Sequence, residues 1–209
     1  IRKNKNNKIK IFIKYMDINF LISLLTIIAF VLLGYSQYES YANEVTSVKS
    51  SVDDNEYLVR DRDDKQEAAN MLATIRNKLQ KLVDSMKLKY PNDESVIRMN
   101  KKFNADNISE SGKSSQYTSY SVNKGEKIVF CIRQKDENES FVDLNTITFV
   151  AIHELAHIMT KSVGHTEEFW KNFKLLLEES IIIDVYTKEK YSQNPKEYCG
   201  IKVTDSPIE

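Results

Sequence analysis

The pattern of hydrophobic positions changes sharply along this chain. Residues 18–35 (INFLISLLTIIAFVLLGY) contain no charged side chain and are mostly Leu, Ile, Phe and Val. The stretch is apolar on all sides of a helix and has about the minimum length that spans a bilayer. We therefore predict a transmembrane helix over residues 17–35. The alternatives are the apolar part of a cleaved signal peptide and a buried core helix.

The charges on either side of this stretch predict its orientation. Residues 1–16 contain six basic side chains and no acidic one, whereas the segment behind the stretch has Glu39 and Glu44 and no basic residue before Lys49. Basic flanks favour the cytosolic side of a membrane. We expect a cytosolic tail at residues 1–16, able to contact anionic lipid. The remainder would lie on the far side, in a lumen, outside the cell or at a virion membrane, as a signal-anchored, single-pass protein.

Residues 36–62 are polar and poor in large apolar side chains, which is typical of a linker or stalk. Behind it, residues 64–67 (DKQE) have the form of a capping box. An amphipathic helix should follow and end near Tyr90, because Pro91 disfavours helix in the residue before it. A globular domain is therefore expected over residues 63–209. The apolar stripe that predicts its first helix consists of Ala68, Leu72, Ile75, Leu79, Leu82 and Met86.

The hydrophobic period then shortens. Residues 117–122 and 127–133 have the alternation and composition of two strands. Residues 123–126 (NKGE) between them suit a hairpin turn, with Gly125 free to take positive φ. Two roles are open for this hairpin: its edge strand binds an extended peptide as an added strand, or the hairpin only packs beneath the helix that follows.

All three histidines of the chain lie within residues 153–165, and residues 153–157 form an H-E-x-x-H pattern (HELAH). On a helix, which Asp143 or Asn145 would cap, positions i and i+4 share a face, so His153 and His157 can bind one metal ion. Apolar residues supply a separate face and leave the histidines free to face a cleft. Glu154 can then take a proton from a water held by the metal.

A catalytic zinc needs a third protein ligand and one open position. His165 is the leading candidate, because Gly164 before it suits the end of the first helix and Thr166 after it suits the start of a second helix, over residues 167–179. His165 would then lie at the corner between two helices. Glu167 or Glu168, in the first turn of the second helix, is the alternative third ligand.

These residues resemble a known family. The run from His153 to His157, then His165 and the aromatic pair at residues 169–170, is similar to the core motif of the WLM-domain and SprT-like zinc metallopeptidases. The resemblance covers about residues 143–177 and implies a zincin-like α+β domain with one Zn²⁺ per chain. It further implies that His153, His157 and His165 are the zinc ligands and that Glu154 is the general base.

The cysteines and the charge balance bear on the compartment of the protein and on its contact with nucleic acid. Cys131 and Cys199 either form a disulfide, as an oxidising compartment favours, or remain separate thiols, and neither belongs to a C-x-x-C metal motif. Asn107 and Asn138 begin N-glycosylation triplets. The 30 basic residues balance 30 acidic ones, and the part behind the apolar stretch is mildly acidic. We therefore expect no direct contact with nucleic acid.

The sequence thus predicts a membrane-anchored zinc metallopeptidase that hydrolyses peptide bonds of a protein or peptide substrate. One alternative is a non-catalytic, zinc-stabilised structural or adaptor protein of a cellular or viral membrane. Another keeps the enzyme and places its domain in the cytosol, near nucleic acid. Richness in Lys, Asn and Ile is typical of an AT-rich genome, such as that of a parasite or a large DNA virus.

Overall fold

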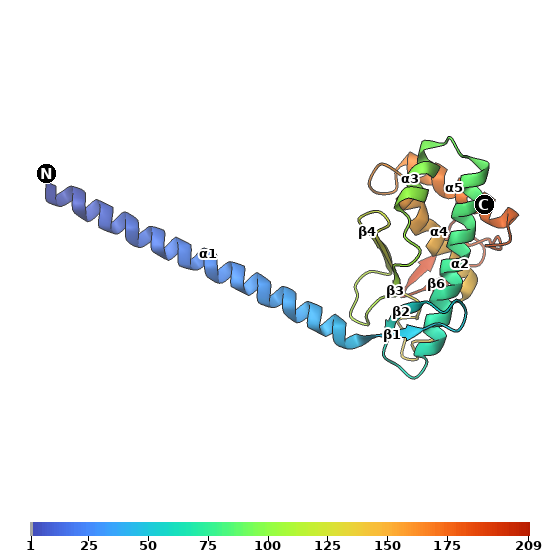
Figure 1. Ribbon diagram of the computed structural model, residues 1–209, viewed down its shortest axis with the longest axis horizontal. Coiled ribbons are helices and arrows are strands. Elements are labelled where there is room, and N and C mark those ends of the chain that lie inside the picture. Colours follow the sequence, from blue (N-terminus) through green and yellow to red (C-terminus); the bar gives the residue numbers. More distant parts are fainter. Residues whose placement is uncertain (1) are drawn as a thin grey trace. The chain divides into compact units, whose positions relative to one another are not determined.

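The computed structural model describes residues 2–209, and for residues 2–17 and 40–43 it describes the backbone alone. The chain divides into two compact units, one that ends at Glu44 and one that spans Val45–Glu209. The first unit is a single helix, α1 (Arg2–Glu44), drawn in blue in Figure 1. Its segment Ile18–Glu39 is long and apolar enough to cross a membrane, and a signal sequence meets the same criteria. The side chains of the predicted basic tail, residues 1–16, lie outside those described.

The second unit begins earlier than the sequence indicates. Strands β1 (Val45–Lys49) and β2 (Glu56–Arg60) form an antiparallel pair. The prediction of a linker over residues 36–62 is therefore wrong for residues 45–60, which belong to the sheet. Only Tyr57 and Val59 of β2 point into the core. Two inward positions among charged neighbours are too few to mark a strand in the sequence.

The remaining strands of the sheet are β3 (Ile108–Glu110), β4 (Ser119–Val122) and β5 (Lys127–Phe130), and the order across the sheet is β1-β2-β3-β5-β4. β2, β3 and β5 run parallel, and the outer pairs are antiparallel. The predicted hairpin is confirmed, with β4 at an edge of the sheet. Gly125 has φ 109°, and a Cβ there would lie 2.6 Å from the carbonyl oxygen of Lys102, so the turn requires glycine.

Four helices complete the domain: α2 (Lys65–Lys89), α3 (Glu94–Lys102), α4 (Leu144–Met159) and α5 (Glu167–Ile182). α2 packs against β2 and α4, and its predicted stripe is buried. It ends before Tyr90, as expected. The predicted capping box does not form, because the Asp64 side chain makes no bond to the helix amides and instead accepts a hydrogen bond from Arg133. The domain is thus a mixed α and β fold.

A second, two-stranded sheet lies near the C-terminus. β6 (Lys196–Tyr198) and β7 (Ile201–Val203) pair antiparallel. A disulfide joins Cys199, directly after β6, to Cys131, directly after β5. The buried Tyr198 also shares a hydrogen bond with Ser119 of β4. The C-terminal hairpin is therefore fixed to the end of the main sheet, and of the two alternatives for the cysteines the structure has the disulfide.

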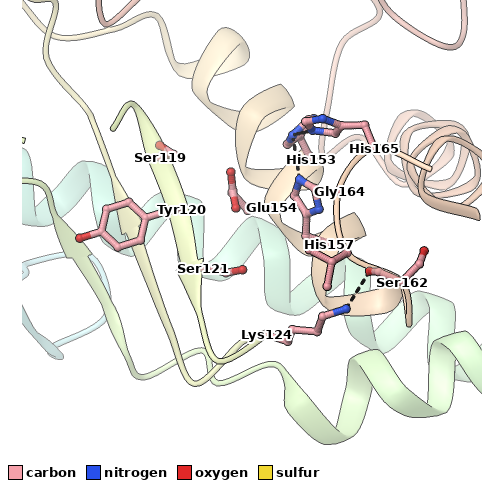
Figure 2. Close-up of a pocket in the computed structure, with 11 residues that line it drawn as sticks. Ser119, Tyr120, Ser121, Lys124, His153, Glu154, His157, Ser162, Gly164 and His165 are labelled. Carbon is pink, nitrogen blue, oxygen red and sulfur yellow. Dashed lines mark hydrogen bonds between the residues drawn. The ribbon is translucent and has the colours of Figure 1, made fainter. Parts of the chain in front are cut away.

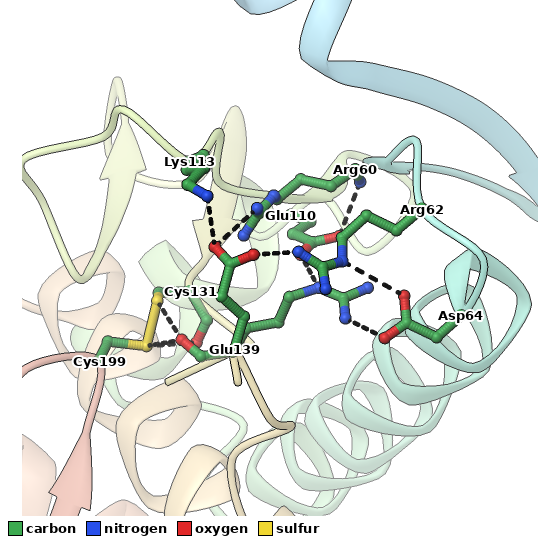
Figure 3. Close-up of polar contacts among 9 residues, drawn as sticks. Arg60, Arg62, Asp64, Glu110, Lys113, Cys131, Glu139 and Cys199 are labelled. Carbon is green, nitrogen blue, oxygen red and sulfur yellow. Dashed lines mark hydrogen bonds and ion pairs between the residues drawn. A yellow bond between two sulfur atoms is a disulfide. The ribbon is translucent and has the colours of Figure 1, made fainter. Parts of the chain in front are cut away.

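A cluster of charged side chains connects the start of α2 to the sheet (Figure 3). The Nε of Arg133 donates to Glu110 across 2.7 Å, and both side chains are only 2% exposed. Arg133 also pairs with Asp64. Beside them, Glu139 accepts a hydrogen bond of 2.9 Å from Arg60. Buried ionic groups are stable only when paired in this way.

Candidate metal centre

The centre is built on α4, which begins as predicted. The carboxylate of Asp143 accepts a hydrogen bond of 2.9 Å from the Thr146 N–H and caps the helix. The apolar positions Ile147, Ala151, Leu155 and Ile158 are fully buried in the core. His153 and His157 lie on another face of the same helix and are only partly buried, so their rings are accessible from a cleft.

The three histidines converge at one point (Figure 2). The Nε2 of His153 lies 3.2 Å from that of His157 and 3.1 Å from that of His165. Nitrogens that bind one tetrahedral zinc ion at about 2.0–2.1 Å are about 3.3–3.4 Å apart. The spacing and the choice of three imidazoles therefore fit a zinc ion.

An aromatic side chain supports all three imidazoles from α5. Phe169 is fully buried, and its ring centroid lies 4.9 Å from that of His153, 4.3 Å from that of His157 and 4.8 Å from that of His165. Burial and the neighbouring histidines lower the pKa of His153 to about 3. Burial, followed by His165 and Lys124, lowers the pKa of His157 to about 4. Both rings are therefore neutral at ordinary pH, as metal ligation requires.

Glu154 is one residue from the first histidine and lies between β4 and the imidazoles in Figure 2. Its side chain lines the cleft, yet the residue is only 6% exposed. Burial raises the pKa of its carboxyl group to about 7, while a hydrogen bond from the backbone of Ser121 opposes the shift. A carboxyl group with a pKa in this range can both accept and return a proton.

His165 comes from the loop between α4 and α5. The helix ends at Met159, well before Gly164, so the prediction that Gly164 ends the helix is wrong, although its φ of 83° is left-handed. Thr166 caps α5 as predicted, since its hydroxyl accepts from the Phe169 N–H.

Neither alternative third ligand joins the histidines. Among the described residues, the group close enough to hold a metal consists of His153, His157 and His165. The carboxylate of Glu168 instead accepts hydrogen bonds from the N–H groups of Lys161 and Ser162. The structure therefore brings His165, and no carboxylate, to the two helical histidines.

The histidines and Glu154 open onto a cleft of about 370 Å³. Its other wall consists of Ser119, Tyr120 and Ser121 of β4, within the predicted hairpin, and of Lys124 in its turn; the sequence marks none of these residues individually as part of a site. A turn composition predicts local geometry but gives no sign of a neighbour across the cleft. Three tyrosines near the C-terminus, Tyr186, Tyr191 and Tyr198, do not line this cleft. Tyr186 and Tyr191 are buried with their hydroxyl groups 3.3 Å apart.

Residues 51–208 match the family model of the WLM domain. The chain belongs to the WLM-domain family. Membership agrees with the motif resemblance and brings the expectation of a metallopeptidase. Uncharacterized protein R325 of Acanthamoeba polyphaga mimivirus is 30% identical over 194 residues, which cover 91% of this chain and 98% of that protein.

Two further comparisons cover less of the chain. Uncharacterized protein 136R of Invertebrate iridescent virus 6 is 34% identical over 82 residues, 39% of this chain and 44% of that protein. The crystal structure of Wss1 from Saccharomyces cerevisiae is similar with a TM-score of 0.47 and 22% identity, over 60% of this chain and 87% of that chain.

Proposed function

We propose that this WLM-family protein is a membrane-anchored zinc metallopeptidase that hydrolyses peptide bonds. The observation that supports it most strongly is the convergence of three histidine nitrogens, 3.1 and 3.2 Å apart, beside a buried glutamate at an open cleft. A purely structural zinc site is normally closed by four protein ligands. Here three imidazoles would leave a fourth position toward the cleft.

The chemistry divides between the metal and Glu154. When bound by His153, His157 and His165, zinc supplies a Lewis acid that polarises a carbonyl group and acidifies water. Glu154 takes the proton of the attacking water on a carboxylate oxygen and delivers it to the nitrogen of the leaving amine. Its burial and its place between the histidines and β4 suit both transfers.

The edge strand β4 suits an extended peptide as substrate. In an antiparallel pair, backbone groups alternate between facing the partner strand and facing away. The N–H of Cys131 bonds the carbonyl of Thr118, so the backbone groups of Ser119 and Ser121 face the open edge. The hydrogen bond that the Ser121 backbone N–H donates to the Glu154 carboxylate agrees with this alternation. A substrate strand that pairs with Ser119 would bring its own peptide bond beside Glu154.

Membrane anchoring rests on α1 and on the disulfide. The segment Ile18–Glu39 is uncharged over its apolar part, and none of it is buried within the chain. The match to the mimivirus protein covers so much of this chain that it includes most of this segment. The Cys131–Cys199 bond suits a domain in an oxidising compartment. We therefore propose that the N-terminus is cytosolic and the catalytic domain lies across the membrane.

Protease protection in sealed vesicles tests this topology. If the domain is lumenal, trypsin added outside should leave residues 45–209 intact until detergent is added. Digestion of the domain in intact vesicles would contradict the proposed orientation and favour a domain in the cytosol.

The enzyme itself is tested with the full chain, residues 1–209, in mild detergent. Zinc content and cleavage of unfolded casein are measured for the wild type, for Glu154→Gln and for Glu167→Gln, an exposed glutamate outside the histidine cluster. One zinc per chain in all three proteins, with activity lost only in Glu154→Gln, is the expected result. One zinc per chain with no activity in any protein would favour the structural or adaptor alternative. Absence of zinc would contradict both.

A further inference from the structure

The loop that holds the third histidine has little hydrophobic support. Between the end of α4 and the start of α5, Val163 is 86% exposed, and a Cβ added at Gly164 would meet no atom within 4 Å. His165 is itself exposed. Since His157 lies on α4 and His165 lies beyond its end, helical geometry does not fix the distance between them. The ring of His165 packs against Phe169 and Trp170, but the loop backbone that leads to it must be held by polar contacts.

Lys124 provides a polar contact with the first half of this loop. Its ammonium group donates to three successive carbonyl oxygens, those of Thr160 at 2.9 Å and of Lys161 and Ser162 at 2.8 Å each. An ammonium group has three N–H donors, so this arrangement uses all of them. These carbonyls follow the negative end of the α4 dipole, where a cation is favourable. Lys124 reaches them from the β4–β5 turn, where it has φ 54°.

Glu168 holds the same backbone through its N–H groups. Its carboxylate accepts from the N–H of Lys161 at 3.0 Å and from the N–H and hydroxyl of Ser162 at 3.2 and 2.8 Å. These bonds to the carboxylate lower the pKa of Glu168 to about 2, so it is ionised. Arg98 adds a bond of 2.7 Å to the carbonyl oxygen of Met159.

We propose that Lys124 and Glu168 are positioning residues that hold His165 at the metal centre. The cation binds the carbonyls of the loop, the carboxylate binds its N–H groups, and together they fix the backbone that leads to His165. This assignment rests on the proposed zinc centre. It also links the two walls of the cleft, because Lys124 belongs to the hairpin that contains β4, while the loop supplies His165.

The test compares zinc affinity in the full chain, by competition with a fluorescent chelator, for the wild type, Lys124→Met and Glu168→Gln. The matched control is Lys171→Met, because Lys171 is exposed and no hydrogen bond or ion pair of its side chain is found within the described part of the chain. Outer-shell changes typically cost about 10–100-fold in metal affinity. We expect that loss for Lys124→Met, a smaller loss for Glu168→Gln, and none for Lys171→Met.

A double-mutant cycle separates positioning from general damage. In a His165→Ala background, Lys124→Met should change zinc affinity by less than about twofold, because the ligand that it positions is gone. Co²⁺ bound to Lys124→Met should also show a ligand-field spectrum altered from that of the wild type. An equal loss of affinity in both backgrounds would overturn the assignment.

Amide hydrogen exchange of the metal-free chain gives a readout that needs no zinc. Residues 161–166 should exchange faster in Lys124→Met and in Glu168→Gln than in Lys171→Met, and unchanged exchange would overturn the assignment. Unaltered zinc affinity in Lys124→Met and Glu168→Gln would overturn only the positioning role of these residues and leave the proposed function standing. A wild-type chain that binds no zinc would overturn both.

Discussion

Removal of the disulfide between Cys131 and Cys199 should lower the unfolding free energy of the WLM domain by about 4 kcal/mol. The two cysteines are 68 residues apart in the sequence. The chain-entropy relation gives about 15 cal/mol/K for a closed loop of this length, which is about 4 kcal/mol at 25 °C. The cysteines are buried, so alanine at both positions removes the bond without exposing a new polar group to the core.

Urea unfolding of the full chain in mild detergent measures this loss. The protein has one tryptophan, Trp170, and it lies on α5 of the WLM domain, so its fluorescence reports on that domain and not on α1. With an m value of about 2 kcal/mol/M, the midpoint should fall by about 2 M in Cys131→Ala/Cys199→Ala. Wild-type protein treated with reductant should unfold close to the double variant.

A midpoint shift below about 0.5 M would refute this reasoning. It would mean that the bond adds little constraint, either because the unfolded chain is already compact in this region or because the bond strains the native domain. If the reduced protein, the double variant and the oxidised protein all had the same urea midpoint, the conclusion would be the same.

Three further predictions use the same assay. Glu110→Gln removes the more buried of the two carboxylates that pair with the buried Arg133, and Asp64 remains, so the cost should be about 3 kcal/mol, the lower end for breaking a buried pair; a cost below about 1 kcal/mol would show that the pair is dispensable. The hydrogen bond from Arg133 lowers the pKa of Asp64 below its usual 3.8, so its stabilising effect is present above that pH and is lost as the pH falls through the lowered value. The midpoint should therefore fall less steeply between about pH 5 and 2 in Asp64→Asn than in the wild type, and identical slopes would contradict the assignment. Gly164→Ala, with open space around it, should cost only about 1–2 kcal/mol for its positive φ, whereas Gly125→Ala adds a backbone clash and should cost clearly more; equal losses would contradict the turn geometry.

Helices α2, α4 and α5 and the β4–β5 hairpin were predictable because their signals are local, whereas the short helix α3 was not predicted. Periodicity over α2 and α4, the Asp143 cap and the composition of the turn at Gly125 all act within a few residues of the chain. The pairing of His153 with His157 is equally local, since it follows from the helical repeat alone. These elements account for two of the three histidines of the candidate metal centre.

The rest depends on contacts between distant segments. From the sequence, Glu168 in the first turn of a helix could be a metal ligand or only a favourable charge for the helix dipole. Only the folded loop shows that its carboxylate binds the N–H groups of Lys161 and Ser162. Lys124 lies in a turn, and the turn pattern does not indicate that its ammonium group reaches the end of α4. β1 and β2 have too few inward apolar positions to stand out from a linker.

The account rests on the claim that His153, His157 and His165 together bind one zinc ion. The most direct measurement is the metal content, by mass spectrometry, of the full chain purified without added metal, beside His157→Ala prepared in the same way. We predict one zinc per wild-type chain and almost none in the variant. A wild-type chain without zinc, or a variant that retains a full equivalent, would contradict the account.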